Sequence, residues 1–309
     1  MCVISTVEVI ILSGFLGSGK TTLLQNLLTE EKRSGRKTAV LMNEIGDISI
    51  DSALLESSTP LMELLDGCIC CTLKDELEIT LLSLYKEHEP EVIYIEATGV
   101  AHPVDVLEGC LSPLLAPDMN VRSVISTIDA VRFLARETFS PHVRRLLEEQ
   151  VKHADDLILN KTDLISAELI KKVQKEIRSF NSFATIHTTR FSQVPLAFIG
   201  YSQRYAQTNE DPVHVKDHLQ IQSFTYQFKG SVSRQAFDEW LLAMPNDILR
   251  MKGFIRFFED KGTTTLFQYS YGISQFFEEA IRLPANLVII GENLDKAKIH
   301  NQLLQLEQQ

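Results

Sequence analysis

The 309-residue sequence lacks a long hydrophobic run and lacks an excess of positive charge. No segment reaches the ~18 apolar residues that a membrane helix needs, which argues against a membrane protein. The chain has 30 lysine and arginine residues against 41 aspartate and glutamate residues, and its formal net charge is -11. Sequence-independent nucleic-acid binding needs clustered basic residues, so no nucleic-acid partner is expected.

Hydrophobic residues make up 44% of the chain and charged residues 23%, which is typical of proteins with packed cores. A chain of this length suits two domains better than one. The apolar N-terminal run is short, lacks a basic flank and leads into a glycine-rich loop. We therefore interpret it as a first strand and not as a signal peptide, and we expect a cytoplasmic protein whose thiols stay reduced.

Short apolar segments rich in valine and isoleucine alternate with helical patterns over residues 1–200. The predicted strands are residues 7–13, 37–43, 91–97, 123–129 and 156–160. Because strands covered on both faces are apolar throughout, this alternation predicts an α/β domain with a doubly wound, mostly parallel sheet. Residues 201–217 are polar and aperiodic, which predicts a linker. Residues 218–309 mix strands with two helical patterns and indicate a small α+β domain with an antiparallel sheet.

The segment GFLGSGKT, residues 14–21, matches the phosphate-loop pattern between a predicted strand and a predicted helix. Backbone N–H groups of such a loop cradle phosphate oxygens at a helix N-terminus. Lys20 would neutralise the β and γ phosphates, and Thr21 would offer its hydroxyl to Mg²⁺. The remaining residues expected at the nucleotide are Gly14, Gly17, Ser18, Gly19, Thr22 and Gly99. A glycine-rich turn without a ligand is the alternative.

Two further motifs follow apolar strands. Glu96 ends the strand VIYIE, and its expected role is to hold a Mg²⁺-bound water, although such a carboxylate can also cap a helix. The sequence NKTD places Asn160, Lys161 and Asp163 after a later strand. Asp163 would accept hydrogen bonds from guanine N1–H and the exocyclic amine, neither of which adenine offers, so GTP is favoured over ATP.

Three of the five cysteines, Cys68, Cys70 and Cys71, lie within four positions in the segment GCICC. Three thiolates that converge favour a soft cation such as Zn²⁺ or Cu(I), and they leave a tetrahedral ion one open position for exchange. A redox pair, a structural site completed by a distant residue, and incidental core cysteines are the alternatives. Cys2 and Cys110 are expected to be incidental.

The segment NEIGDISID, residues 43–51, lies upstream of the cysteines, and Glu96 lies downstream. Segments in such places order around the γ-phosphate of P-loop GTPases and relax after hydrolysis. Asp47 or Glu44 could therefore reach Mg²⁺ or a sulfur-bound metal, and Asp47 is counted with Lys20, Thr21 and Glu96 as a candidate catalytic residue. Solvated loop acids are the alternative.

The ordered set GFLGSGKTTLL, NEIGDISID, GCICC, IEATGVAHP and NKTD resembles the CobW-type metal-chaperone GTPases of the SIMIBI class over nearly the whole chain. The resemblance implies a Mg²⁺-dependent GTPase that binds a transition metal, Zn²⁺ before Co²⁺, at the three cysteines. It also implies delivery of that metal to a client metalloprotein, and it leaves a homodimer open. Hydrolysis is expected to be slow, because no intrinsic arginine finger is evident.

The chain departs from the family pattern at two places. Met42 stands where some relatives carry an acid, which leaves the fourth metal ligand undetermined. Only His214 and His218 remain where many relatives carry a histidine-rich tract, and His102 could join a metal or phosphate network. A metal-sensing regulatory switch without delivery, and a nucleotide enzyme with a structural cysteine cluster, are the competing interpretations.

Overall fold

The computed structural model describes residues 6–42, 60–63, 72–199, 221–245, 247–260, 263–270, 272–279, 283–292 and 294–308. The chain divides into two compact units, one of residues 1–110 and 118–211 and the other of residues 111–117 and 212–309. The predicted linker 201–217 and the predicted ligands His214, His218, Asp47, Glu44, Cys68, Cys70 and Cys71 lie outside the described residues. The predicted domain limits at residues 200 and 218 stay a prediction.

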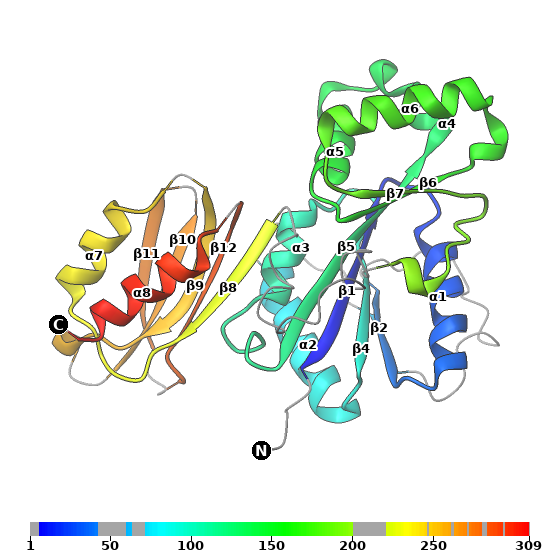
Figure 1. Ribbon diagram of the computed structural model, residues 1–309. Coiled ribbons are helices and arrows are strands. Elements are labelled where there is room, and N and C mark those ends of the chain that lie inside the picture. The colour runs from blue at the N-terminus through cyan, green and yellow to red at the C-terminus, as the bar shows by residue number, and fades with distance from the viewer. Residues whose placement is uncertain are drawn as a thin grey trace. The chain divides into compact units, whose positions relative to one another are not determined.

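The first unit contains a seven-stranded sheet in the order β3-β2-β4-β1-β5-β6-β7, and every neighbouring pair of strands is parallel. This arrangement confirms the predicted doubly wound α/β domain (Figure 1). The strands are β1 (Val7–Gly14), β2 (Thr38–Met42), β3 (Leu61–Glu63), β4 (Val92–Glu96), β5 (Met119–Asp129), β6 (Asp156–Asn160) and β7 (Thr185–Thr188).

The helices of the first unit cover both faces of this sheet. They are α1 (Lys20–Ser34), α2 (Thr72–His88), α3 (Pro103–Cys110), α4 (Ala130–Leu134), α5 (Pro141–Lys152) and α6 (Ala167–Phe180), with the 3₁₀ helices η1 (Arg136–Thr138), η2 (Thr162–Leu164) and η3 (Leu196–Phe198). Within the described ranges, no helix of either unit has the length and apolar composition needed to span a bilayer.

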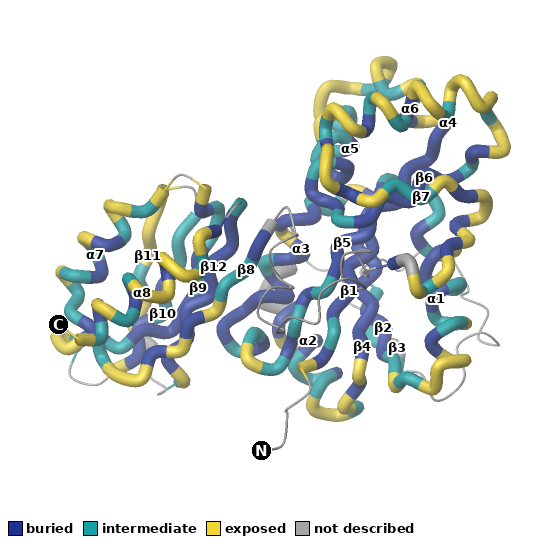
Figure 2. The backbone as a smooth tube through the Cα atoms, viewed as in Figure 1, coloured by how far each residue is buried: buried dark blue, intermediate teal, exposed yellow. Residues whose placement is uncertain are grey.

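Alternate residues of one strand show how the two faces are covered. Ile158 of β6 packs in the cluster that contains the buried leucines of α1. Its neighbours Leu157 and Leu159 point the other way, into the cluster formed with α5 and α6. Because successive side chains of a strand alternate between faces, every residue of β6 is buried, as Figure 2 shows for the central strands. Burial on both faces explains why these strands read as continuous apolar runs.

The second unit contains a five-stranded antiparallel sheet in the order β11-β10-β9-β12-β8. Its strands are β8 (Ile221–Gln227), β9 (Ile248–Ile255), β10 (Thr264–Ser270), β11 (Ile273–Glu279) and β12 (Asn286–Glu292); its helices are α7 (Arg234–Leu242), α8 (Lys296–Leu306) and the 3₁₀ helix η6 (Phe258–Asp260). Phe237 and Trp240 of α7 and Leu303 of α8 pack in the core of this sheet. The predicted small α+β domain is confirmed.

Candidate nucleotide-binding site

The phosphate loop has a backbone that only glycine adopts without strain at its key positions. Gly14, Gly17 and Gly19 have φ values of 131°, 71° and 111°, all in the left-handed half of conformational space. A Cβ atom on Gly14 would lie 2.4 Å from the carbonyl oxygen of Thr127, and one on Gly19 would lie 2.4 Å from Nδ2 of Asn160. The loop is therefore fitted closely to β5 and β6 beside it.

The Lys20 side chain is turned into the loop, and the Ser18 side chain contacts the sheet. Lys20 is the first residue of α1 and is only 7% exposed, and its Nζ donates to the carbonyl of Gly14 at 2.9 Å. Ser18 Oγ lies 2.5 Å from Oγ1 of Thr127 on β5, so the loop is tied to the central sheet. The backbone N–H groups at the start of α1 and the Lys20 ammonium together form a site of positive potential that suits a polyphosphate.

Thr21 and Glu96 lie together at the carboxyl edge of the sheet. Thr21 Oγ1 donates to Oε1 of Glu96 at 2.7 Å, and Glu96 is 8% exposed. Glu96 ends β4, level with Leu12 of β1 and Met42 of β2. A hydroxyl and a carboxylate in contact provide the oxygen ligands that Mg²⁺ prefers, so these two residues fit the ion. When bound, Mg²⁺ would neutralise charge on the β and γ phosphates.

The NKTD residues support the loop from the β6 side. Asn160 is 3% exposed and donates through Nδ2 to the carbonyl of Ser18 at 2.9 Å. Lys161 has a left-handed backbone, with φ 58°, and its Nζ donates to Gly17 O at 2.7 Å. Asp163 lies in η2 with an exposed side chain, where a carboxylate is accessible to a base. The structure brings all three residues to the loop end of β6.

The segment that follows β7 also supports the phosphate loop, and no sequence motif predicted this role. Asn160 Oδ1 accepts from the backbone N–H of Ser192 at 2.9 Å, and Ser192 Oγ donates to Gly19 O at 3.0 Å. Phe191 and Ser192 have left-handed φ values of 53° and 52°. Phe191 is 72% exposed beside these contacts. This turn is strained for residues other than glycine, a feature common at functional sites.

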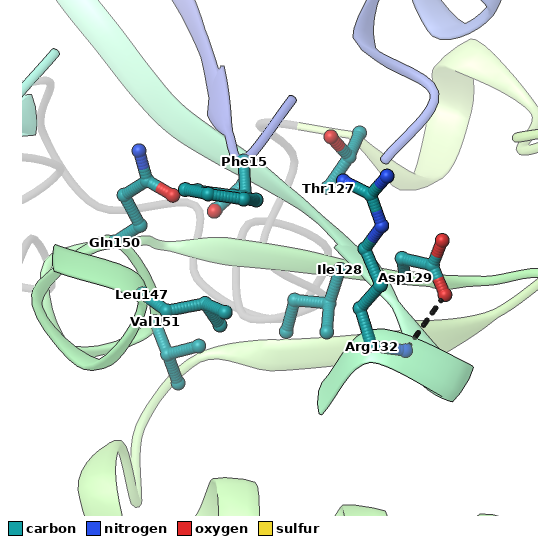
Figure 3. Close-up of a pocket in the computed structure, with 9 residues that line it drawn as sticks. Phe15, Thr127, Ile128, Asp129, Arg132, Leu147, Gln150 and Val151 are labelled. Atoms are coloured by element: carbon teal, nitrogen blue, oxygen red, sulfur yellow. Dashed lines mark hydrogen bonds between the residues drawn. The ribbon is translucent and has the colours of Figure 1, made fainter. Parts of the chain in front are cut away.

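Arg132 contacts the phosphate loop directly and Asp129 contacts it through Lys161, and neither residue was predicted from the sequence. Asp129 ends β5, caps α4 through Oδ1 at 3.0 Å from two backbone N–H groups, and pairs through Oδ2 with Lys161 Nζ at 2.6 Å. Arg132 donates to the carbonyl of Leu16. Figure 3 shows Asp129 and Arg132 on one side of a small pocket, with Phe15 and Gln150 on the other. An aspartate at the end of an apolar strand was the signal that could have found this pair.

Gly99 and Thr22 complete the predicted set. Gly99 is buried against the loop, since a Cβ on it would lie 2.6 Å from the backbone N of Leu16. Its carbonyl accepts from Nε2 of Gln150 on α5 at 3.2 Å. Thr22 is exposed on the first turn of α1. Every predicted nucleotide contact that the structure describes therefore lies at or beside the phosphate loop, while the individual roles stay predictions.

The sequence matches two protein-family models. Residues 8–188 match the CobW/HypB/UreG nucleotide-binding domain, and residues 221–307 match the cobalamin synthesis protein cobW C-terminal domain. The chain belongs to the CobW/HypB/UreG family. The resemblance predicted from the ordered motifs is thereby confirmed.

Two curated relatives of this CobW-type chain cover 98% and 62% of it. The zinc chaperone CobW of Pseudomonas aeruginosa is 29% identical, covering 98% of this chain and 92% of the relative. The zinc chaperone YjiA of Escherichia coli is 32% identical, covering 62% of this chain and 60% of the relative. The crystal structure of Zn(II)-bound YjiA GTPase from E. coli matches with a TM-score of 0.50 at 24% identity, over 97% of this chain and 99% of that one, which shows the shared fold.

The cysteine segment joins the domain between two elements that the structure describes, β3 and α2. β3 ends at Glu63, five positions before Cys68, and α2 begins at Thr72, next to Cys71. Glu63 pairs with Met42, and Met42 pairs with Glu96, so the three strand ends are level. Neighbouring strands lie ~4.8 Å apart, which places the backbone of Glu63 roughly 10 Å from that of Glu96.

Proposed function

We propose that this chain is a GTPase metallochaperone that carries a transition metal at Cys68, Cys70 and Cys71 and delivers it to a client protein. The enzyme would convert GTP and water into GDP and phosphate with Mg²⁺ at Thr21 and Glu96. Zn²⁺ is the proposed cargo and Co²⁺ the secondary one. The names of the zinc chaperones in P. aeruginosa and E. coli support zinc, and three thiolate ligands suit it chemically.

One observation carries the proposal. The strand that leads to the cysteines ends level with Glu96, whose carboxylate accepts from Thr21, the proposed Mg²⁺ ligand. A five-residue extension spans at most ~18 Å, and Glu63 is only two strands from Glu96, so Cys68 is within reach of the γ-phosphate side of the site. A rearrangement of this edge on hydrolysis would therefore move the metal ligands and change their affinity for the metal.

The guanine preference rests on Asp163. Its carboxylate is exposed one turn beyond Asn160, which is itself fixed under the phosphate loop. A base held above Lys161 would present its Watson–Crick edge to Asp163, and only guanine supplies two donors there. Asn160 and Lys161 would act by holding the loop and covering the base.

Replacement of Cys68, Cys70 and Cys71 by serine tests the metal site. We expect Zn²⁺ affinity to fall by about 100-fold or more, since serine hydroxyls are poor ligands for soft cations. Competition titration of reduced protein with a chromophoric chelator measures the affinity, and Co²⁺ absorbance reports loss of thiolate charge transfer. GTP binding measured without Zn²⁺ should change little, which shows that the variant is folded.

Cys110→Ala is the matched control. Cys110 is fully buried at the end of α3, and burial raises the pKa of its thiol, so it stays protonated and is not a metal ligand. Its replacement should leave Zn²⁺ affinity as in the parent. Equal Zn²⁺ affinity in the parent and the triple serine variant would overturn the proposed cargo site.

A further inference from the structure

Three side chains of the types that bind metals meet close to the Gly99 segment. His102 lies in the turn before α3, Glu149 lies on α5, and His153 is the residue at which α5 ends. One ligand atom from each lies within 4.8 Å of the other two. His153 Nε2 is 2.8 Å from Glu149 Oε2, His102 Nε2 is 3.9 Å from the same oxygen, and the two imidazole rings are 5.7 Å apart.

A simple helical ion pair accounts for only part of this arrangement. Glu149 and His153 are one turn apart on α5, and such pairs are common without a metal. The third member, His102, comes from a segment 47 positions upstream of Glu149 and faces the same carboxylate oxygen. Nε2 is the ring nitrogen of His153 that faces the cluster, whereas Nδ1 is buried with no hydrogen-bond partner in the described part of the chain. Two imidazoles and one carboxylate are a ligand set used for Zn²⁺ with one open position.

The exposure of the three side chains suits a cation site that is open to solvent. The side chains of His102 and Glu149 are 34% and 25% exposed, whereas that of His153 is 6% exposed. The set therefore has a buried anchor and an opening to solvent.

The cluster is linked to the nucleotide site through Gln150. This residue lies next to Glu149, and its Nε2 donates to the carbonyls of Gly99 and Ala101 at 3.2 and 3.3 Å. Gly99 in turn packs directly on Leu16 of the phosphate loop. The segment that carries His102 is thus already held to α5 at two carbonyls, immediately beyond Glu96.

We propose that His102, Glu149 and His153 form a second transition-metal site, built from nitrogen and oxygen ligands, that tethers the Gly99–His102 segment to α5. The cation is a divalent first-row ion of the Zn²⁺ and Co²⁺ class. Because the site uses no cysteine, it does not depend on the proposed cargo site, and a metal there would restrain the segment next to Glu96.

Binding has a defined local cost. His102 Nδ1 accepts from the backbone N–H of Val104 at 3.3 Å, so the proton of its neutral ring is on Nε2. A metal bound at Nε2 requires that proton to move to Nδ1, which breaks this long hydrogen bond. We therefore expect binding weaker than that of a three-thiolate site, and a change at the first turn of α3 when metal binds.

A thiol-free background isolates the second site. Full-length protein with Cys68, Cys70 and Cys71 replaced by serine should still bind one equivalent of Co²⁺, with visible d–d absorbance and no thiolate charge-transfer band. Glu149→Gln and His102→Gln in this background should each lower Co²⁺ affinity by about 10-fold or more, by analogy with the loss of supporting ligand contacts. His153→Gln should also lower Co²⁺ affinity. If the His153 variant does not fold, the variants at His102 and Glu149, which are partly exposed, still test the site.

His142→Gln is the matched control, since His142 is an exposed histidine in the first turn of the same helix. It should leave Co²⁺ affinity unchanged. Zn²⁺ should also slow amide hydrogen exchange across residues 99–102 in the thiol-free protein. Absence of stoichiometric Co²⁺ binding there, or Co²⁺ affinity in all three ligand variants equal to that of the thiol-free parent, would overturn the site. Unchanged exchange would overturn the tether. Neither result bears on metal binding by the cysteines.

Discussion

Replacement of Lys20 by alanine is expected to lower kcat/KM for GTP hydrolysis by at least about 100-fold, the scale seen when a preorganised charge is removed from a transition state. Lys20 Nζ now lies across the phosphate loop on the Gly14 carbonyl. With a nucleotide bound, the same ammonium is within the loop that cradles the β and γ phosphates. Phosphate release under single-turnover conditions measures the effect, and titration with a fluorescent GTP analogue separates binding from chemistry.

Lys32→Ala is the matched control for that variant. Lys32 is exposed in the last turn of the same helix, far along α1 from the loop. Its loss should leave hydrolysis close to the parent rate. Because Lys20 is buried, thermal unfolding of both variants should be compared first. A folded Lys20→Ala protein with parental hydrolysis would show that the phosphate loop is not the catalytic centre.

Asp163→Asn should change which nucleotide the protein prefers. The carboxylate is expected to accept from guanine N1–H and the exocyclic amine, and an amide cannot accept both. We expect GTP affinity to fall by roughly 100-fold or more, as in other sites that lose a matched hydrogen-bonding group. Xanthosine triphosphate carries a carbonyl in place of the amine, which the new amide N–H₂ can donate to, so its affinity should rise.

Competition titrations with GTP, ATP and xanthosine triphosphate measure this change. Glu168→Gln is a suitable control, because Glu168 is an exposed acid in the first turn of α6, five positions after Asp163. That control should keep the parental order of affinities. If Asp163→Asn also kept the parental order, the base would not be read at the NKTD motif.

Strands buried on both faces were predictable from the sequence, and polar edge strands were not. β1, β4 and β6 are apolar runs because α helices cover both of their faces. β7, with the sequence TIHT, is only partly buried at the edge of the sheet, and β11 is an edge strand that carries two glutamates. β3 has three residues. Neither an alternating hydrophobic pattern nor an apolar run identified these segments. They become strands because the neighbouring strand offers its backbone hydrogen bonds.

The candidate site divides in the same way. The loop glycines, Lys20, Thr21 and Asn160 form motifs with fixed spacing, so the sequence alone placed them at one ligand. Ser192 and Arg132 act through single hydrogen bonds to loop carbonyls, and their positions depend on how the chain returns to the sheet. The meeting of His102 with α5 is likewise a tertiary contact between segments that no spacing rule connects.

The central claim is that the nucleotide and the cysteine-bound metal change each other's affinity. The direct measurement is a Zn²⁺ competition titration of reduced, full-length protein with Mg²⁺ and a non-hydrolysable GTP analogue, with Mg²⁺ and GDP, and without nucleotide. Linkage of the usual size predicts Zn²⁺ affinities that differ by roughly 5- to 150-fold between the GTP-analogue and GDP states, with the difference lost when Cys68, Cys70 and Cys71 are serine. One and the same Zn²⁺ affinity in all three states of the parent protein would contradict the account.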